Sequence, residues 1–457
     1  MLDYILTRQF YGSSYPLEMT HIVPSLLFNL GLPFASYALT NVLVMFFALT
    51  LLVFYAPFSK LQKFLFIFSY YLFYEYNIIA RSWSYGILFF FCLAVLYKNR
   101  FKRPILYNLF LFLFALSHIY TFIFAAILAA VYYYELFQNV FREKKESFTK
   151  THGICLLLLF SGFFYIFYPT INPQNVPAEF SAWNTEISIH HLGAVPTAVI
   201  DAYLPVPKLQ INFWQSRGIS RALYGLPLFL LTMLFFIRKP TLLLLYLALC
   251  SSLFAVLFVR TICAFRHHGL LFIIFIYCLW VAKEYQESNF TIKWHVNTKV
   301  LNAILVVLLS IQVIAAGIAS YYDWTYDFSS AERAASFLKK GGYLTDQSFI
   351  ASYPSVEMSS ILVRTPEYPK FYYLEYGEFR SFMVTSEETY RFNDRPHPLT
   401  EISETIKQAT ENKGYTTILL ILDRPIESNE EGAEQYKLLA GFEENAINTP
   451  IMIYEYY

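Results

Sequence analysis

Charged residues are scarce in this chain. Asp, Glu, Lys and Arg make up 15% of its 457 residues, whereas a soluble protein carries about 25%. Hydrophobic residues instead make up 56% and aromatic residues 20%. This balance excludes an ordinary water-soluble globular protein. It indicates a polytopic membrane protein, because each spanning helix needs about 20 mostly apolar residues.

Cysteine is also rare, and no two cysteines form a CxxC pair. A disulfide framework and a zinc site both need regularly spaced partners, so the sequence indicates neither. It specifies no cofactor and leaves open whether a divalent cation takes part. The five cysteines all lie in the apolar part of the chain: Cys92, Cys155, Cys250, Cys263 and Cys278.

The near-neutral net charge of +1 hides two parts of opposite sign. From Asp323 to the C-terminus there are 12 basic and 22 acidic residues, a net charge of −10. The first 322 residues hold the other 22 basic and 11 acidic residues, a net charge of +11. We therefore predict a transmembrane domain over residues 1–322 and a soluble, acidic domain over residues 323–457.

The transmembrane part contains about ten apolar segments long enough to be spans. Alternate loops between them hold 15 basic residues, and the opposite loops hold seven. Because cytoplasmic loops collect Lys and Arg, the basic loops are predicted to be cytoplasmic and the acidic domain to face outward. Segment 104–135 could also be one long helix or a buried hairpin, with His118 at its tip. The predicted spans are 36–57, 64–80, 82–97, 104–118, 119–135, 153–169, 222–237, 241–259, 267–282 and 300–320.

The same charge pattern places the N-terminus outside, although residues 1–20 contain no span that would carry it across. A first helix encoded upstream of Met1 and a natural short form both remain open. The apolar segment from Pro16 to Pro33 is interrupted by prolines, and we predict an interfacial helix on the outer membrane surface.

The acidic domain alternates helix and strand patterns. An amphipathic helix is predicted over Ser329–Lys340, ending at two glycines, and a second over Leu399–Asn412. Strands are predicted over Ser348–Ser352 and Thr416–Leu422. We therefore predict that residues 323–457 form a small α/β domain. Its sequence contains neither a Gly-rich phosphate loop nor a nucleophile elbow.

Any carboxylate chemistry at the outer face of the transmembrane domain must use one of six acidic residues, namely Asp3, Glu18, Glu75, Glu179, Glu186 and Asp201. Glu75 lies at the end of one predicted span, Glu18 lies on the interfacial helix, and Asp3 lies near the N-terminus. We predict that one of these three acts as a general base. For Glu75, the alternative is a structural ion pair with Arg81 at the membrane boundary.

Outer turns also carry guanidinium and imidazole groups. Arginine suits phosphate oxygens because its planar fork donates two parallel hydrogen bonds. The alternatives are snorkelling of the basic side chains, structural histidines, and Trp83 as an interfacial anchor. The predicted phosphate-binding residues are Arg81, Arg260, Arg266 and His267, and the predicted substrate-binding residues are His21, His118, Tyr120 and Trp83.

The run EYNIIARSW, followed directly by an apolar span, resembles the E-A-R-x-Y junction of GT-C membrane glycosyltransferases. These include protein-mannosyltransferase-like and lipid A sugar-transferase-like bacterial enzymes. Further stretches resemble an uncharacterised bacterial branch of that superfamily, and the resemblance covers most of the chain. The stretches are GLPFASYALTNVLVMF, LFIFSYYLFYEYNIIARSWSYG, YKNRFKRPILYNLFLFLFALSHIY, FRHHGLLFIIFI and FSSAERAASFLKKGG.

The resemblance implies transfer of a sugar from a polyprenyl-phosphate donor to a glycan, lipid or protein acceptor at the outer face of a bacterial inner membrane. The basic residues do not indicate a nucleic-acid partner, because cytoplasmic loops collect Lys and Arg. Similar enzymes carry an acidic loop after their first helix, and this chain lacks that helix and most of the loop. A non-catalytic membrane scaffold or accessory protein is therefore the alternative. A transporter is disfavoured because the ionisable residues lie at span ends rather than in mid-span.

Overall fold

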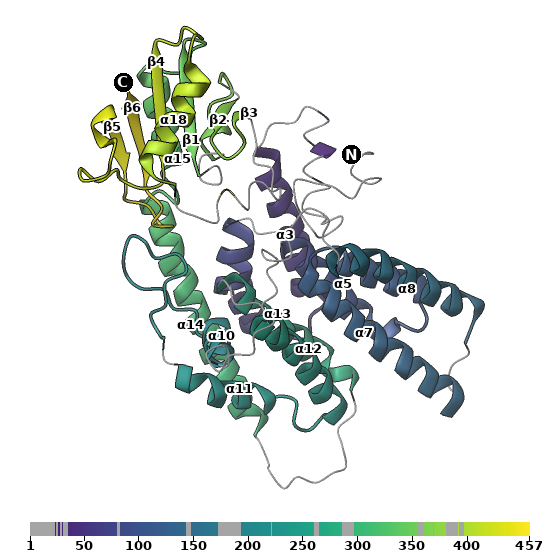
Figure 1. Ribbon diagram of the computed structural model, residues 1–457. Coiled ribbons are helices and arrows are strands. Elements are labelled where there is room, and N and C mark those ends of the chain that lie inside the picture. Colours follow the sequence, from purple (N-terminus) through teal and green to yellow (C-terminus); the bar gives the residue numbers. More distant parts are fainter. Residues whose placement is uncertain are drawn as a thin grey trace.

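The structure is a computed structural model. It describes residues 35–79, 83–142, 148–171, 193–220, 222–259, 265–285, 297–354, 360–368, 370–380 and 397–457, together with residues 23, 26, 27, 30 and 392. Figure 1 shows two parts: a bundle of helices, and a sheet part carried on the C-terminal end of the long helix α14. The predicted interfacial helix at Pro16–Pro33 falls almost entirely outside the described residues.

The bundle is built from apolar helices. Its described α-helices are α3 (Ala35–Tyr55), α4 (Lys60–Ile67), α5 (Trp83–Leu96), α6 (Pro104–Ala115), α7 (Ile119–Phe137), α8 (Lys150–Ile171), α10 (Ala194–Tyr203), α11 (Gly225–Met233), α12 (Pro240–Val259), α13 (Phe265–Val281) and α14 (Thr298–Thr325). A π-helix, η1 (Tyr70–Ile78), follows α4, and a second, η3 (Gln138–Arg142), extends α7. Short 3₁₀ turns are η2 (Tyr97–Asn99), η5 (Ala222–Tyr224) and η6 (Ala282–Glu284).

Six described helical segments are long and apolar enough to cross a membrane, which indicates a multi-pass membrane protein. They are Ala38–Tyr55, Ile119–Arg142, Lys150–Tyr168, Pro240–Phe258, Phe265–Glu284 and Thr298–Thr325. Three more predicted spans form shorter apolar helices, Trp83–Asn99, Pro104–Ala115 and Ala222–Met233. The predicted span 64–80 is divided between α4 and η1. The ten-span count therefore stays a prediction.

One feature of the bundle decides between two alternatives predicted from the sequence, and another feature was not predicted. Segment 104–135 forms two helices, α6 and α7, that pack against each other as a hairpin. The connection between the predicted spans 153–169 and 222–237 contains the helix α10, most of whose residues are buried against α11 and α13. This helix was not predicted, because ten residues are too few to give a span signal.

The described helix ends that border the basic loops gather at one end of the bundle. There Arg100 pairs with Glu135 at 2.8 Å, and the amide of Gln62 donates to Asn302 Oδ1 at 3.4 Å. The hydroxyl groups of Tyr97 and Tyr285 also form a hydrogen bond at this end. These contacts join the starts or ends of helices that are far apart in the sequence, so one end of the bundle carries the basic loops.

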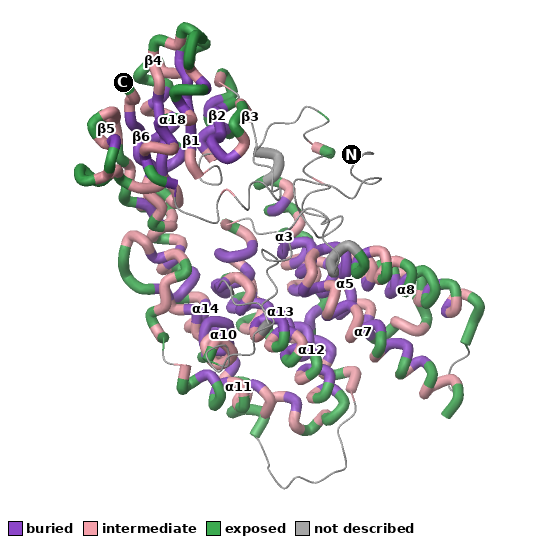
Figure 2. Tube along the Cα trace, viewed as in Figure 1, coloured by how far each residue is buried: buried purple, intermediate pink, exposed green. Residues whose placement is uncertain are grey.

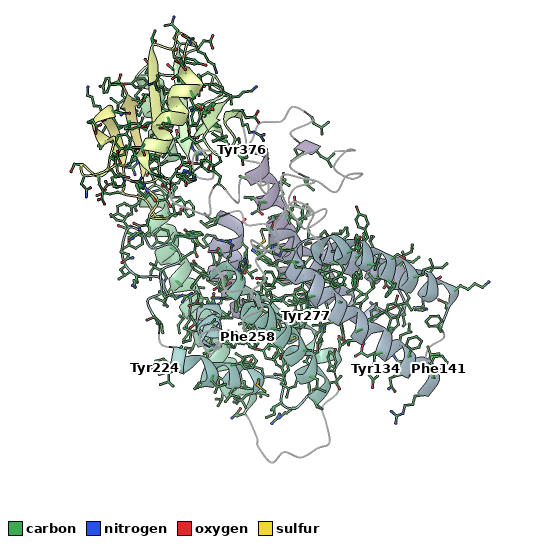
Figure 3. All side chains as sticks on the ribbon, viewed as in Figure 1. Tyr134, Phe141, Tyr224, Phe258, Tyr277 and Tyr376 are labelled. Atoms are coloured by element: carbon green, nitrogen blue, oxygen red, sulfur yellow. The ribbon has the colours of Figure 1, made fainter. Side chains whose placement is uncertain are left out.

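Large apolar side chains cover the outside of several helices. On α8, Leu157, Phe160 and Phe164 are all exposed, and Figure 2 shows exposed residues along that helix while α13 is mostly buried. In Figure 3, Tyr277 of α13 lies in the middle of the bundle, whereas Tyr134 lies near the far end of α7. A soluble surface seldom carries such a continuous apolar area, so these faces suit contact with lipid chains.

The C-terminal part contains a six-stranded mixed sheet in the order β3-β2-β1-β4-β6-β5. Strand β1 (Ser348–Tyr353) is parallel to β2 (Phe371–Tyr373) and to β4 (Thr417–Leu422). Strand β3 (Glu378–Arg380) pairs antiparallel with β2. Strand β6 (Ile451–Tyr456) lies antiparallel between β4 and β5 (Tyr436–Phe442).

Alternating side chains of the strands cover the two faces of this sheet. Ile350 of β1 lies in a core with α15 (Ala331–Lys340), whereas its neighbours Phe349 and Ala351 lie in a second core with α18 (Leu399–Thr410). The period of two in a strand places neighbours on opposite faces. The four elements predicted in this part are confirmed to within three residues at each end, and β2, β3, β5 and β6 were not predicted.

Candidate functional site

Six of the eleven site residues predicted from the sequence lie in the described part of the chain: Glu75, Trp83, His118, Tyr120, Arg266 and His267. The other five, Asp3, Glu18, His21, Arg81 and Arg260, lie outside the described residues. All six described residues belong to the end of the bundle opposite the basic loops, which is also the end where α14 leads into the sheet part.

Four of these residues form one aromatic cluster. The ring centroid of Trp83 lies 3.9 Å from that of His118 and 5.5 Å from that of Tyr120. The imidazole of His267 lies 5.7 Å from Trp83 and 5.2 Å from Tyr120. The rings come from α5, α7 and α13 and from the turn before α7. We call Trp83, His118, Tyr120 and His267 the aromatic cluster.

Helix starts position this cluster. His118 is the N-cap of α7 in an extended conformation, and its Nδ1 accepts a hydrogen bond from the backbone N–H of Tyr120 at 3.4 Å. Such a cap satisfies one of the N–H groups that a helix start leaves without a partner. Trp83 is the first residue of α5, and His267 lies in the first turn of α13. Three chain segments thus present their first turns to one another.

Glu75 lies on the π-helix η1 and is only 1% exposed. The hydroxyl of Tyr70 donates to Glu75 Oε2 at 3.4 Å. The amide of Asn41 on α3 donates to the backbone oxygens of Tyr76 and Asn77 at 3.1 and 3.3 Å, which fixes the end of η1. A buried carboxylate is costly unless it is hydrogen-bonded or used, and π-helical segments are frequent at functional sites.

The π-helix packs tightly on the start of α13. The hydroxyl of Tyr76 donates to the backbone oxygen of Arg266 at 2.8 Å, and the rings of Tyr71 and Phe265 stack with centroids 6.0 Å apart. At Gly269 a Cβ atom would lie 2.2 Å from the Tyr71 ring, so a side chain there would collide with η1. The close approach brings the segment that carries Glu75 against the segment that carries Arg266 and His267.

The structure adds a buried charge cluster that the sequence analysis missed. Asp201 of α10 is 2% exposed, and its Oδ2 lies 2.8 Å from His268 Nδ1 and 3.0 Å from Arg217 Nε. The hydroxyl of Tyr71 donates to the backbone oxygen of Asp201 at 2.8 Å. His268 is also buried, and its Nε2 has no hydrogen-bond partner among the described residues. We call Asp201, Arg217 and His268 the Asp201 cluster.

A sequence signal for this cluster was present but weak. Asp201 is the single charged residue in AVPTAVIDAY, and a lone carboxylate in an apolar stretch is usually paired or functional. We counted it among the outer acidic residues without making it a site residue, because α10 was not predicted. The partners Arg217 and His268 are 16 and 67 positions away, and no local pattern connects them to Asp201.

The segment that follows α10 connects the site to the sheet part. The ring of Phe213 lies 6.2 Å from that of Tyr74 on η1 and 5.3 Å from that of Tyr322 near the end of α14. Trp214 contacts Phe328 just before α15, with centroids 5.5 Å apart. Segment 204–220 therefore contacts both η1 and the junction between α14 and α15.

Taken together, this end of the bundle holds two buried carboxylates, an aromatic cluster, and arginine side chains at the border of the apolar region. Carboxylates and imidazoles can accept a proton from a hydroxyl group, and guanidinium groups can bind phosphate oxygens. A comparison with models of known protein families finds no match. A comparison with curated proteins finds no significant match either.

Proposed function

We propose that this chain is a membrane glycosyltransferase that moves a sugar from a polyprenyl-phosphate donor to an acceptor at the outer face of the membrane. The observation that carries the proposal is the burial of Glu75 on η1, packed against the α13 segment of Arg266 and His267. The resemblance of EYNIIARSW to the GT-C junction covers the same π-helix and its continuation. The proposal includes ten spans in a bacterial inner membrane and an extracytoplasmic sheet part.

In this proposal Glu75 is the general base. It takes the proton of the acceptor hydroxyl while the acceptor oxygen attacks the anomeric carbon of the sugar, and the bond from that carbon to the phosphate oxygen breaks. Polyprenyl phosphate leaves with the bonding electrons. A base must come within about 3 Å of the proton it removes, so the acceptor has to reach the buried side chain. Asp3 and Glu18 remain candidates for the same role.

The positive groups stabilise the leaving phosphate. Arg266, with Arg81, Arg260 and His267, binds the phosphate oxygens, and fixed donors around a developing charge lower the barrier. The planar surfaces of Trp83, His118 and Tyr120, together with His21, hold the sugar or the acceptor. No step requires a metal ion at these residues, and a divalent cation on the phosphate would act beside them.

His268 is a second proton acceptor in the same site. Because Asp201 accepts a hydrogen bond at Nδ1 of His268, that nitrogen carries the proton and the lone pair lies on Nε2. The tautomer follows from the hydrogen-bond network. Since His268 directly follows His267, the two imidazoles belong to one turn of α13. A Glu75→Gln variant that keeps half or more of the turnover would favour His268 over Glu75.

The test is a donor-turnover assay on the full chain in lipid nanodiscs. Polyprenyl-phosphate monosaccharides with different sugars are supplied together with cell-envelope glycans, lipids and proteins as acceptors, and release of free polyprenyl phosphate is followed by chromatography. We expect release with at least one sugar. A chain that binds such a donor but never releases polyprenyl phosphate would contradict the transferase proposal and favour the accessory role.

The orientation has its own test by cysteine labelling. In the proposed topology Asn99 lies in the cytoplasm and Glu430 outside. We expect a cysteine at position 430 to react with an impermeant thiol reagent in intact cells, and one at position 99 to react only after permeabilisation. Labelling of both positions from the same side would contradict the ten-span topology.

A further inference from the structure

An open groove lies between the first turns of α6 and α8, at the end of the bundle that carries the basic loops. Its volume is about 490 Å³, and its lining includes Lys102, Arg103, Ile105, Leu109, Thr149 and His152. We call it the α6–α8 groove. It lies at the opposite end of the bundle from Glu75 and the aromatic cluster, so it is not part of the site proposed for sugar transfer.

The entrance of the groove carries positive charge. Lys102 and Arg103 are both exposed, and no carboxylate in the described ranges pairs with either of them. Their neighbour Arg100 differs, because it pairs with Glu135 at 2.8 Å. Helix α6 begins at Pro104, directly beside the two basic residues. The positive end of its dipole adds to their field, so the groove favours an anion.

A buried imidazole beside the groove lacks a hydrogen-bond partner on one side. His152 is 5% exposed, and its Nδ1 accepts from the backbone N–H of Thr149 at 3.2 Å and lies 2.7 Å from the Thr149 hydroxyl. With Nδ1 as the acceptor, the neutral ring carries its proton on Nε2. Within the described residues, that N–H has no acceptor. An oxygen atom bound in the groove that His152 lines would supply one.

The other wall of the groove is apolar and faces outward. Ile105 and Leu109 are exposed and lie four residues apart, so they share one face of α6. This face starts at the basic residues and runs along the helix into the apolar zone. A ligand that fits both walls has an anionic head and a long apolar tail, which describes an anionic phospholipid and neither a free phosphate ion nor an acidic peptide.

We propose that the α6–α8 groove binds an anionic phospholipid of the leaflet that borders the basic loops. Its phosphate contacts Lys102, Arg103 and His152, and one acyl chain lies along Ile105 and Leu109. Basic pockets between spanning helices are typical sites for lipid head groups. The inference does not depend on the proposed transferase activity, because none of these residues belongs to that site.

The test is native mass spectrometry of the full chain in detergent, with phosphatidylglycerol or phosphatidylcholine added. We expect selective retention of phosphatidylglycerol, and at least a tenfold weaker affinity for it in the double variant Lys102→Gln/Arg103→Gln, since each basic contact to an anionic lipid contributes about a fivefold factor. The matched control is Lys60→Gln/Lys299→Gln. It removes the same charge from the same end of the bundle, at exposed residues outside the groove, and should change affinity less than threefold.

Two further variants separate the phosphate contact from general charge. His152→Phe keeps a ring of similar size next to Phe148 but removes the N–H, so it should weaken phosphatidylglycerol binding several-fold with unchanged circular dichroism. Leu109→Glu should block the acyl chain. Equal losses in the groove and control double variants would overturn the proposal. Displacement of the lipid by millimolar glycerol phosphate or by an acidic peptide would overturn it as well.

Discussion

We predict that the Asp201 cluster holds segment 204–220 against α10, and the size of this effect can be measured. Asp201 Oδ2 forms an ion pair with Arg217 Nε at 3.0 Å and accepts a hydrogen bond from His268 Nδ1 at 2.8 Å, and Arg217 belongs to that segment. Asp201→Asn keeps the shape of the side chain and one acceptor oxygen but removes the negative charge. We therefore expect the segment to detach from α10 more often, with little change elsewhere in the bundle.

The size of the effect follows from the burial of the pair. Breaking a fully buried ion pair costs about 3–5 kcal/mol, whereas an exposed pair contributes about 0.2–1 kcal/mol. Because Asp201 is buried but the Arg217 side chain is 36% exposed, we expect a contribution between these two ranges. About 1.5 kcal/mol corresponds to an opening equilibrium about tenfold more favourable.

Hydrogen–deuterium exchange measures this opening directly, because amide exchange in a native protein reports local unfolding. Amides of the segment form internal hydrogen bonds, including Val206 to Leu204 O and Gly218 to Val206 O. In Asp201→Asn they should exchange about tenfold faster.

The matched control is Glu332→Gln, which removes the charge from an exposed pair with the same donor atom, Arg364 Nε, at 2.8 Å. An exposed pair contributes about 0.2–1 kcal/mol, so the amides of Arg364 and Thr365 should accelerate less than about fivefold. Unchanged exchange over residues 204–220 in Asp201→Asn would refute the role of the cluster as an anchor.

Two other predictions concern packing and pH. Gly269→Ala should lower the melting temperature, since the added Cβ meets the Tyr71 ring at 2.2 Å and overpacking costs about 1–3 kcal/mol, whereas Gly317→Ala, with no atom within 4 Å, should not. In the sheet part, a hydrogen bond from Arg424 lowers the pKa of Glu430, so the pair stabilises the fold at neutral pH and loses its effect as the pH falls below about 4. Arg424→Ala should therefore reduce the acid sensitivity of the sheet part in a pH series of thermal melts, and an unchanged pH profile would contradict this sign.

The sequence predicted long elements well because their signals are local. The apolar runs of α3, α12 and α14 each have at least 18 residues, and the amphipathic pattern of α15 includes buried positions three or four residues apart. Strands β2 and β3 were missed because three residues are too few to give a pattern, whereas β5 and β6 were missed although they are as long as the predicted strands. The sheet order also depends on the pairing of β1 with β4, which joins residues 69 positions apart.

The aromatic cluster could be predicted only as separate residues. Trp83, His118 and His267 each lie at a predicted span end, and the topology placed all three at one end of the bundle. Their ring contacts depend on how α5, α7 and α13 pack. That η1 is a π-helix could not be read from Tyr70–Ile78, because aromatic residues there mask any helical period. The Asp201 cluster required the fold itself, since its three members come from different segments.

The most direct measurement of the central claim is donor turnover by the wild-type chain and by Glu75→Gln, side by side in nanodiscs. Tyr70→Phe is the control, because it removes the hydroxyl that donates to Glu75 while leaving the carboxylate. Each protein is first checked for folding by circular dichroism. We expect the wild type to release polyprenyl phosphate, Tyr70→Phe to retain a measurable rate, and Glu75→Gln to lose at least a hundredfold, the contribution typical of a general base. Release by folded Glu75→Gln at the wild-type rate would contradict the assignment of Glu75 as the base.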